Sequence, residues 1–190
     1  MRKLAITLAA LFVVGCATGP KPPTYKRDYE PVDAKEFKYE DKNIVFTYTP
    51  MTFGSSIPFV MTNKTDKPIK VIWDETTFIN PSGQSEKVIH EGVRLLDRNA
   101  PMVPSMIPPK ASLTDSISPT SRVIWSGTSW EHLMICGEQK LIPFTGYEQR
   151  DEECIGKTFG LFVTYEVEGK KLNLSQKYKL VGREVAGPVR

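Results

Sequence analysis

The feature that most constrains the fold is an alternation of apolar and mostly polar residues near the C-terminus. The apolar side consists of Phe159, Leu161, Val163, Tyr165 and Val167 in a first run, and of Leu172, Leu174, Tyr178 and Leu180 in a second. A period of two indicates a β-strand with one buried face, and the polar residues 168–171 between the runs are typical of a turn. The pattern predicts a long β-hairpin that covers a core with one face and turns its other face, Thr164 included, to water.

Shorter segments upstream repeat this period. Residues 44–49, 57–62, 69–73 and 86–90 alternate in the same way, and Trp73 is expected in the core. Short strands, turn residues at intervals of roughly ten residues and no long amphipathic helix predict an all-β fold, an antiparallel immunoglobulin-like β-sandwich. A lipocalin-like closed meander is the alternative, which long irregular segments at 97–110 and 126–157 disfavour.

The N-terminus has the composition of a signal peptide. Arg2 and Lys3 precede an apolar stretch of eleven residues, 4–14, in which Thr7 is the one polar residue, and this is well short of the ~20 residues that span a bilayer. Residues 13–16 then read Val-Val-Gly-Cys. Here the chain resembles the lipobox of bacterial lipoproteins, which has aliphatic residues, a small residue and an obligatory cysteine.

This resemblance implies a cellular location and a lipid anchor. In the family the signal peptide, here residues 1–15, is removed, and the cysteine, here Cys16, carries a diacylglycerol and a further acyl chain, which together hold a protein at a membrane permanently. An Asp after the cysteine retains such proteins at the inner membrane, and Ala17 and Thr18 stand there instead. Placement at the outer membrane, facing the periplasm, is therefore expected.

The segment after the cysteine differs from the rest of the chain in composition. Residues 17–35 contain four prolines and seven charged residues, too few apolar groups to offset the entropy of ordering. We therefore expect residues 16–35 to form a lipidated, flexible tether, residues 36–182 the β-sandwich domain and residues 183–190 a C-terminal tail. The alternative is that Tyr25 and Tyr29 pack onto the domain as an early strand.

Two cysteines remain once the resemblance assigns Cys16 to lipid. Cys136 and Cys154 form an even pair in a compartment that permits oxidation, so we expect a disulfide. A metal site would need further ligands, and His90 and His132 are the only histidines of the chain. No metal and no cofactor are expected.

The long segment 126–157 holds the candidate partner-binding residues. Trp130, Phe144 and Tyr147 are aromatic anchors of the kind that supply much of the energy of protein interfaces. The alternative is that they cover one end of the domain. A second segment, 97–110, has four prolines and is predicted to be a rigid surface connection, with copper(I) binding by its methionines as the alternative.

Charge and motifs exclude several classes of function. The formal net charge of +3 falls to +1 when Arg2 and Lys3 leave with the signal peptide, which disfavours nucleic-acid binding. Neither a nucleophile elbow nor a zinc-protease motif nor a phosphate-binding or dinucleotide loop occurs in the sequence, so an enzyme is not expected. The sequence predicts a non-catalytic, outer-membrane-anchored lipoprotein that acts as a protein-interaction or structural module of the cell envelope. The alternative is a periplasmic small-ligand or metal carrier.

Overall fold

The structure is a computed structural model that describes residues 25–50, 56–142 and 146–185. Within these ranges the chain forms β-strands and four short 3-10 turns, and no α-helix occurs in them. The elements of the first half are β1 (Tyr25–Val32), β2 (Lys38–Glu40), β3 (Ile44–Tyr48), β4 (Ile57–Asn63), β5 (Ile69–Val71), η1 (Trp73–Glu75), β6 (Thr77–Ile79), β7 (Ser85–His90) and η2 (Leu95–Asp97). The second half contains β8 (Ser105–Ile107), β9 (Ser112–Pro119), η3 (Thr120–Arg122), β10 (Val123–Trp125), β11 (Trp130–His132), β12 (Glu138–Ile142), β13 (Gly146–Arg150), η4 (Glu152–Cys154), β14 (Thr158–Val167) and β15 (Lys170–Val185).

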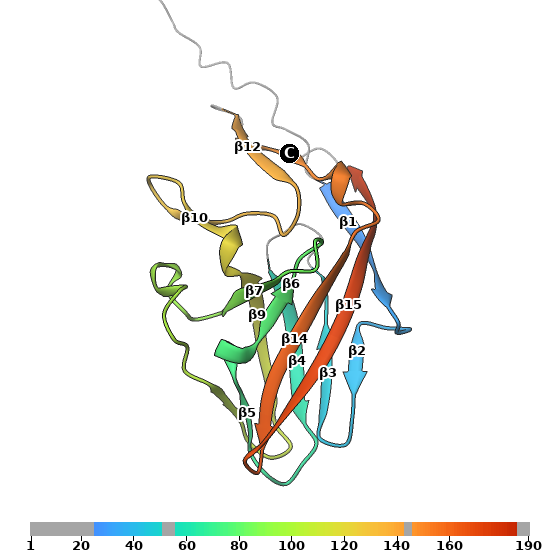
Figure 1. Cartoon of the computed structure of the whole chain (residues 1–190), viewed down its shortest axis with the longest axis vertical. Helices are drawn as coiled ribbons and strands as arrows, with labels where there is room; N and C mark the ends of the chain where they lie inside the picture. The colour runs from blue at the N-terminus through green and yellow to red at the C-terminus, as the bar shows by residue number, and fades with distance from the viewer. Residues whose placement is uncertain (1–24, 51–55, 143–145, 186–190) are drawn as a thin grey trace, which may run out of the picture.

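Eleven strands form one antiparallel sheet in the order β1-β15-β14-β6-β7-β9-β4-β3-β2, and β5 and β8 extend it beside β14. β10 pairs with β11, and β12 pairs with β13, as separate two-stranded ribbons. The sheet curls so that β14 and β15 lie in front of β3, β4 and β9 in Figure 1. The predicted all-β, antiparallel fold is confirmed. The finer immunoglobulin-like assignment stays a prediction, because β6 and β7 join the two halves into one hydrogen-bonded sheet.

The core lies between the two halves of this curled sheet. Tyr48 of β3 and Tyr178 of β15 come from opposite halves, and their ring centroids are 6.2 Å apart. Phe46 and Phe59 stack within one half at 5.2 Å. Alternate side chains of each strand enter this core because the period of a strand is two, and that places the other side chains on the outer face.

Trp73 is fully buried, as predicted, but it lies in a 3-10 turn rather than in a strand. This turn, η1, separates β5 from β6, and both of these strands pair with β14. The indole Nε1 donates a hydrogen bond to Ser105 Oγ (3.0 Å), and the ring stacks on His90 at 4.2 Å.

The C-terminal hairpin is confirmed, with one correction. β14 and β15 pair from Thr158↔Lys179 to Val167↔Lys170, and their apolar residues enter the core. Thr164, predicted to face water, is only 3% exposed. The turn η1 explains this burial, because η1 lies over the face of β14 that was predicted to contact water. There the Thr164 hydroxyl donates a hydrogen bond to the Glu75 carbonyl oxygen (2.9 Å).

Both predicted domain boundaries need correction. Residues 25–32, assigned to the tether, form β1, which pairs with β15 from Tyr25↔Val185 to Val32↔Lys177. β15 runs on to Val185 and so includes the first residues of the predicted tail. The partner strand satisfies the backbone of each segment, which composition did not reveal. The predicted signal peptide and the first part of the tether lie outside the described residues.

The irregular segment 97–110 also contains a strand. β8 pairs with β5 through Ile69↔Ile107, and Ile107 is buried. Its two methionines differ in environment, since Met102 is 7% exposed and packs in the core while Met106 is 57% exposed. The part of the chain that the structure describes contains no helix with the length and apolar character that a membrane span requires.

Candidate functional site

The predicted disulfide is present. Cys136 and Cys154 are joined with an S–S distance of 2.07 Å and a Cα–Cα distance of 6.1 Å. The bridge connects the residues before β12 to η4, so the β12–β13 ribbon is closed into a loop at its base. Of the other predicted site residues, Cys16 and Phe144 lie outside the described residues, and Tyr147 is placed by its backbone in β13.

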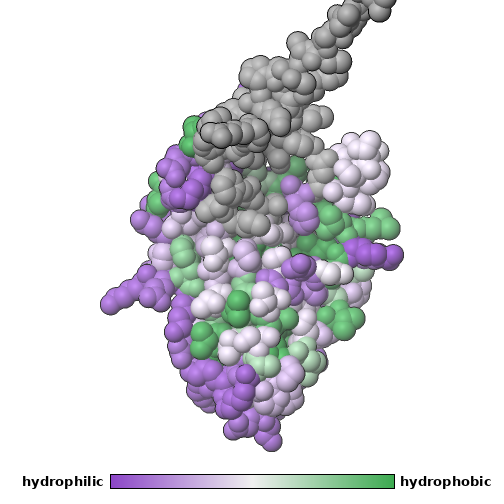
Figure 2. Space-filling model, turned by 180° about the vertical axis from the view of Figure 1, so that it is seen from behind, coloured by the Kyte–Doolittle hydropathy of each residue, from purple (hydrophilic) through white to green (hydrophobic). Residues whose placement is uncertain are grey.

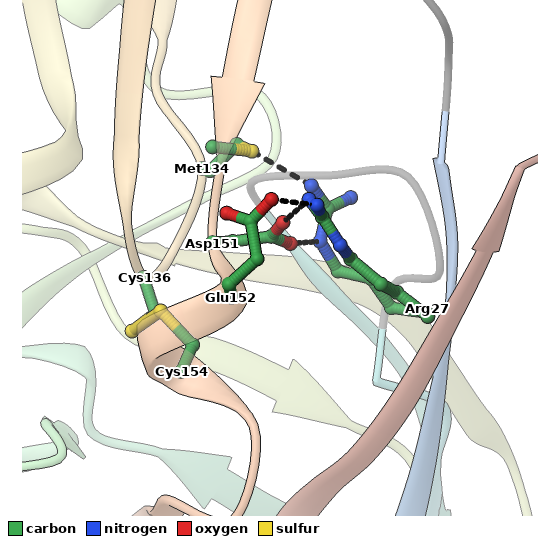
Figure 3. Close-up of polar contacts among 7 residues, drawn as sticks. Arg27, Met134, Cys136, Asp151, Glu152 and Cys154 are labelled. Atoms are coloured by element: carbon green, nitrogen blue, oxygen red, sulfur yellow. Dashed lines mark hydrogen bonds and ion pairs between the residues drawn. A yellow bond between two sulfur atoms is a disulfide. The ribbon is translucent and has the colours of Figure 1, made fainter.

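A buried ion-pair cluster lies beside this disulfide (Figure 3). Arg27 of β1 donates from Nε to Asp151 Oδ2, and their side chains are only 3% and 2% exposed. Arg183 of β15 binds the other Asp151 oxygen and also Glu152. Nη2 of Arg27 contacts Met134 Sδ (2.8 Å). The cluster therefore connects the first strand, the last strand and the bridged segment.

This cluster was not foreseen from sequence. Three consecutive acidic residues, 151–153, are typical of a solvated surface, yet Asp151 is 1% exposed. Its two arginine partners come from the two segments assigned to the tether and the tail. Arg27 and Arg183 are directly paired residues of β1 and β15, and only this pairing across the sheet brings both arginines to Asp151, so the sequence carried no local signal of the cluster.

A second group of residues forms an exposed aromatic surface. Trp125 of β10 and Trp130 of β11 are paired across the ribbon, with ring centroids 5.6 Å apart. The guanidinium of Arg98 lies 4.4 Å from the centroid of the Trp130 ring. Exposed apolar side chains accompany them: Leu96 (66%), Val103 (83%), Ile124 (38%) and Trp125 (54%).

We call the surface formed by Arg98, Trp125 and Trp130, together with the exposed Leu96 and Val103 of the neighbouring 90–103 segment, the aromatic face. Ile124 alternates with Trp125 along β10 and therefore lies on the other side of the ribbon. Figure 2, seen from behind, shows hydrophobic surface gathered on the side where the 90–103 segment and β10 lie in Figure 1. Of the predicted anchors, Trp130 belongs to this face. Trp125 was missed, although the residues 126–129 between the two tryptophans, Ser-Gly-Thr-Ser, are a turn signal for a hairpin.

His90 lies at the end of the core next to a carboxylate. Its Nδ1 is 3.0 Å from Asp115 Oδ2, and its ring stacks on Trp73. Asp115 is 7% exposed and also accepts hydrogen bonds from the backbone N–H groups of Glu91 (2.9 Å) and Ser116 (2.7 Å). These contacts hold the imidazole in one orientation. A histidine and an aspartate in contact are two of the three residues of a serine-hydrolase triad, which also needs a serine.

The strand register separates this pair from the nearby serines. His90 pairs with Ile117, and Ile89 pairs with Ser118. Paired residues share a face of a sheet, so His90 and Asp115 project towards the core while Ser116 and Ser118 project outwards. In the described part of the chain no hydrogen bond joins either serine to an imidazole, and no three His, Cys, Asp or Glu residues form a metal-binding group.

Two hollows border the turn that follows β7. One has a volume of about 310 Å³ and is lined by the outer face of β7 and β9, by Leu95 and by His132 of β11. The second, of about 520 Å³, runs between His90 and the residues up to Val103, with Met102 in its wall. Both hollows adjoin the aromatic face, because the same 90–103 segment contributes to all three.

Comparison of the sequence with protein-family models and with curated proteins found no match. The residues and their geometry therefore carry the functional inference for this chain.

Proposed function

We propose that this protein is a non-catalytic lipoprotein, anchored to the outer membrane through Cys16, whose domain binds another protein of the cell envelope. The anchor rests on the signal-peptide composition of residues 1–15 and on the lipobox at residues 13–16. The binding activity rests on the aromatic face, and the exposed Trp125 beside Trp130 is the observation that carries it.

The composition of the aromatic face favours a protein as the bound partner. Tryptophan and arginine are enriched among the residues that dominate interface energies, and Arg98 packs against the Trp130 ring. Val103 is 83% exposed, and covering such a side chain contributes about 25 cal/mol to the free energy of binding for each Å² of apolar surface that a partner removes from water. Paired tryptophans with an arginine stacked on one of them, exposed at the surface, are typical of an interaction site.

The β10–β11 ribbon is built to present these side chains rigidly. Its pairing runs from Val123↔His132 to Trp125↔Trp130, and Val123 is buried beneath it. At the turn, the Ser126 backbone N–H donates to the Ser129 carbonyl oxygen (2.9 Å). Little conformational entropy is then lost at the tryptophans when a partner binds.

Membrane attachment is tested by replacing the acylated residue. Cys16→Ser should move the protein from the membrane fraction to the soluble fraction, and mass spectrometry of the native protein should find acyl chains on residue 16. An intact leader or an unacylated Cys16 in the native protein would overturn the anchor.

Partner binding is tested by photo-crosslinking in intact cells. A photoreactive amino acid at Trp125 should yield a discrete crosslinked protein, and the same probe at Val60 should not. Val60 is a suitable control because it is also an exposed apolar residue (36%), on the outer face of β4. Equal products from both positions, or none from Trp125, would contradict the proposed docking surface.

A further inference from the structure

The smaller hollow beside His132, which we call the hydroxyl pocket, has polar groups that no part of the described protein uses. Its volume is about 310 Å³, and its lining includes Ser56, Ser116, Ser118 and His132. Pockets from about 300 Å³ upwards are large enough for a small organic molecule.

The strand register directs the serine side chains into this pocket. Ser118 lies opposite Ile89 on the outer face of β7 and β9, and Ser116 has the same orientation two residues earlier. His132 approaches from β11, which folds over this face, and Ser56 directly precedes β4. Residues from four separate parts of the chain thus converge on one hollow.

The hydroxyls have unused hydrogen-bonding capacity. Within the described residues, the side chains of Ser56, Ser116, Ser118 and His132 have no hydrogen-bond partner in the protein. Ser118 is only 3% exposed as a residue, but its hydroxyl is not sealed from solvent and lines the pocket. A molecule in the pocket can therefore supply the hydrogen-bond partner that the protein does not.

The charge of the lining limits the kind of molecule. Among the described residues that line the pocket there is no Lys and no Arg, and Glu91 contributes its one carboxylate. An anion would therefore meet no permanent positive charge. Burial lowers the pKa of His132, so its imidazole is neutral at neutral pH and offers one donor and one acceptor.

The lining also includes the aliphatic side chains of Ile89, Val93 and Leu95, and Ile89 is paired with Ser118 on the same face of the sheet. A ligand that fits this mixed lining has both hydroxyl or amide groups and C–H groups on its surface. We infer that the hydroxyl pocket binds a neutral sugar or a closely related polyol. This inference concerns the folded domain and does not depend on the anchor or on the protein partner.

Calorimetry and ligand-observed NMR on the full mature chain can test this with defined probes. We expect glucose, galactose, N-acetylglucosamine or one of their disaccharides to bind saturably, and glucose 6-phosphate and glucuronate to bind at least tenfold more weakly than their neutral counterparts. Absence of binding by every neutral probe, or equal binding of the charged ones, would overturn the inference.

Variants locate the binding. Ser118→Ala and His132→Phe should each weaken the binding of the best neutral probe about tenfold, because each removes one hydrogen-bonding group from the pocket. Ser175→Ala is the matched control, since Ser175 is exposed on β15, and its affinity should equal that of the unmodified protein. Near-UV circular dichroism checks that all three variants are folded. Unchanged affinity in both pocket variants would show that the sugar binds elsewhere.

Discussion

Replacement of Asp151 by Asn tests whether the N-terminal segment is part of the folded domain. The Arg27 and Asp151 side chains are 3% and 2% exposed, and the substitution removes the Asp151 negative charge from the buried guanidinium of Arg27. Breaking a buried pair in this way costs about 3–5 kcal/mol of unfolding free energy, since the remaining charge stays desolvated. With a urea m-value of about 2 kcal/mol per M, the midpoint should fall by roughly 2 M.

Urea unfolding followed by tryptophan fluorescence measures this loss, because Trp73 is fully buried in the folded state. Limited trypsin digestion gives a second readout that is specific to β1. Cleavage after Lys26 or Arg27 should be slow in the unmodified protein, where both residues are paired in β1, and markedly faster in the Asp151→Asn variant.

Two control variants distinguish destabilisation by the buried Arg27 charge from destabilisation by a general loss of packing. Adding Arg27→Met to Asp151→Asn should recover part of the lost stability, because the buried positive charge that Asp151 had neutralised is then gone. Lys26→Met removes an ion pair from the same strand, but Lys26 is 47% exposed and 3.3 Å from Glu184, so its loss should stay below about 1 kcal/mol. A loss of less than 1 kcal/mol in Asp151→Asn, with trypsin cleavage unchanged, would refute the reasoning that this cluster holds β1 in the fold.

Three further predictions concern the core and the disulfide. Replacing Cys136 and Cys154 by Ala should lower the unfolding free energy by about 3 kcal/mol in urea titrations, because the bridge closes a separation of 18 residues. Tyr178→Phe should leave the stability unchanged or raise it by up to about 1 kcal/mol, since its hydroxyl is buried without a partner, whereas Tyr165→Phe should destabilise by about 1–3 kcal/mol through loss of the bond to Asp41 (2.7 Å). Burial raises the pKa of Tyr29 and of Tyr48 from 10.0 to about 12, so the two neutral side chains stabilise the fold fully below pH 10, and this stabilisation is lost as the pH rises towards 12. Tyrosinate absorbance and unfolding should therefore change together between pH 10 and pH 12. Ionisation of both residues in a protein that is still folded would contradict this prediction.

Local patterns predicted the elements whose partners are close in sequence. The hairpin of β14 and β15 could be predicted because two alternating runs are separated by a short turn, which fixes both the pairing and the buried face. The burial of Trp73 followed from the apolar face of residues 69–73 in the same way. The disulfide also needed little three-dimensional information, since two cysteines were left to pair.

The predictions that were wrong, and the features that were missed, depend on contacts between segments that are far apart in the chain. β1 is rich in charge and contains Pro31, so its composition indicated a tether, yet its partner β15 lies 158 positions away for the pair Lys26 and Glu184. Asp151 is buried because Arg27 and Arg183 neutralise it, and no local pattern contains this information. The hydroxyl pocket is a similar case, because Ser118 and His132 meet only after β11 folds over β9.

The position of β1 changes what the proposed lipid anchor would do. A tether of residues 17–35 could lift the domain by about 60 Å at ~3.1 Å per residue, whereas β1, the first strand of the described residues, begins at Tyr25, nine Cα–Cα steps after Cys16 and so within about 30 Å of it. Any force on an acylated Cys16 would enter the domain at Tyr25, where β1 pairs with the end of β15. Arg27, two residues further on, is bound to Asp151 and through it to the bridged segment. The buried ion pairs and the disulfide therefore lie where an anchored domain would need the most resistance to peeling of its first strand.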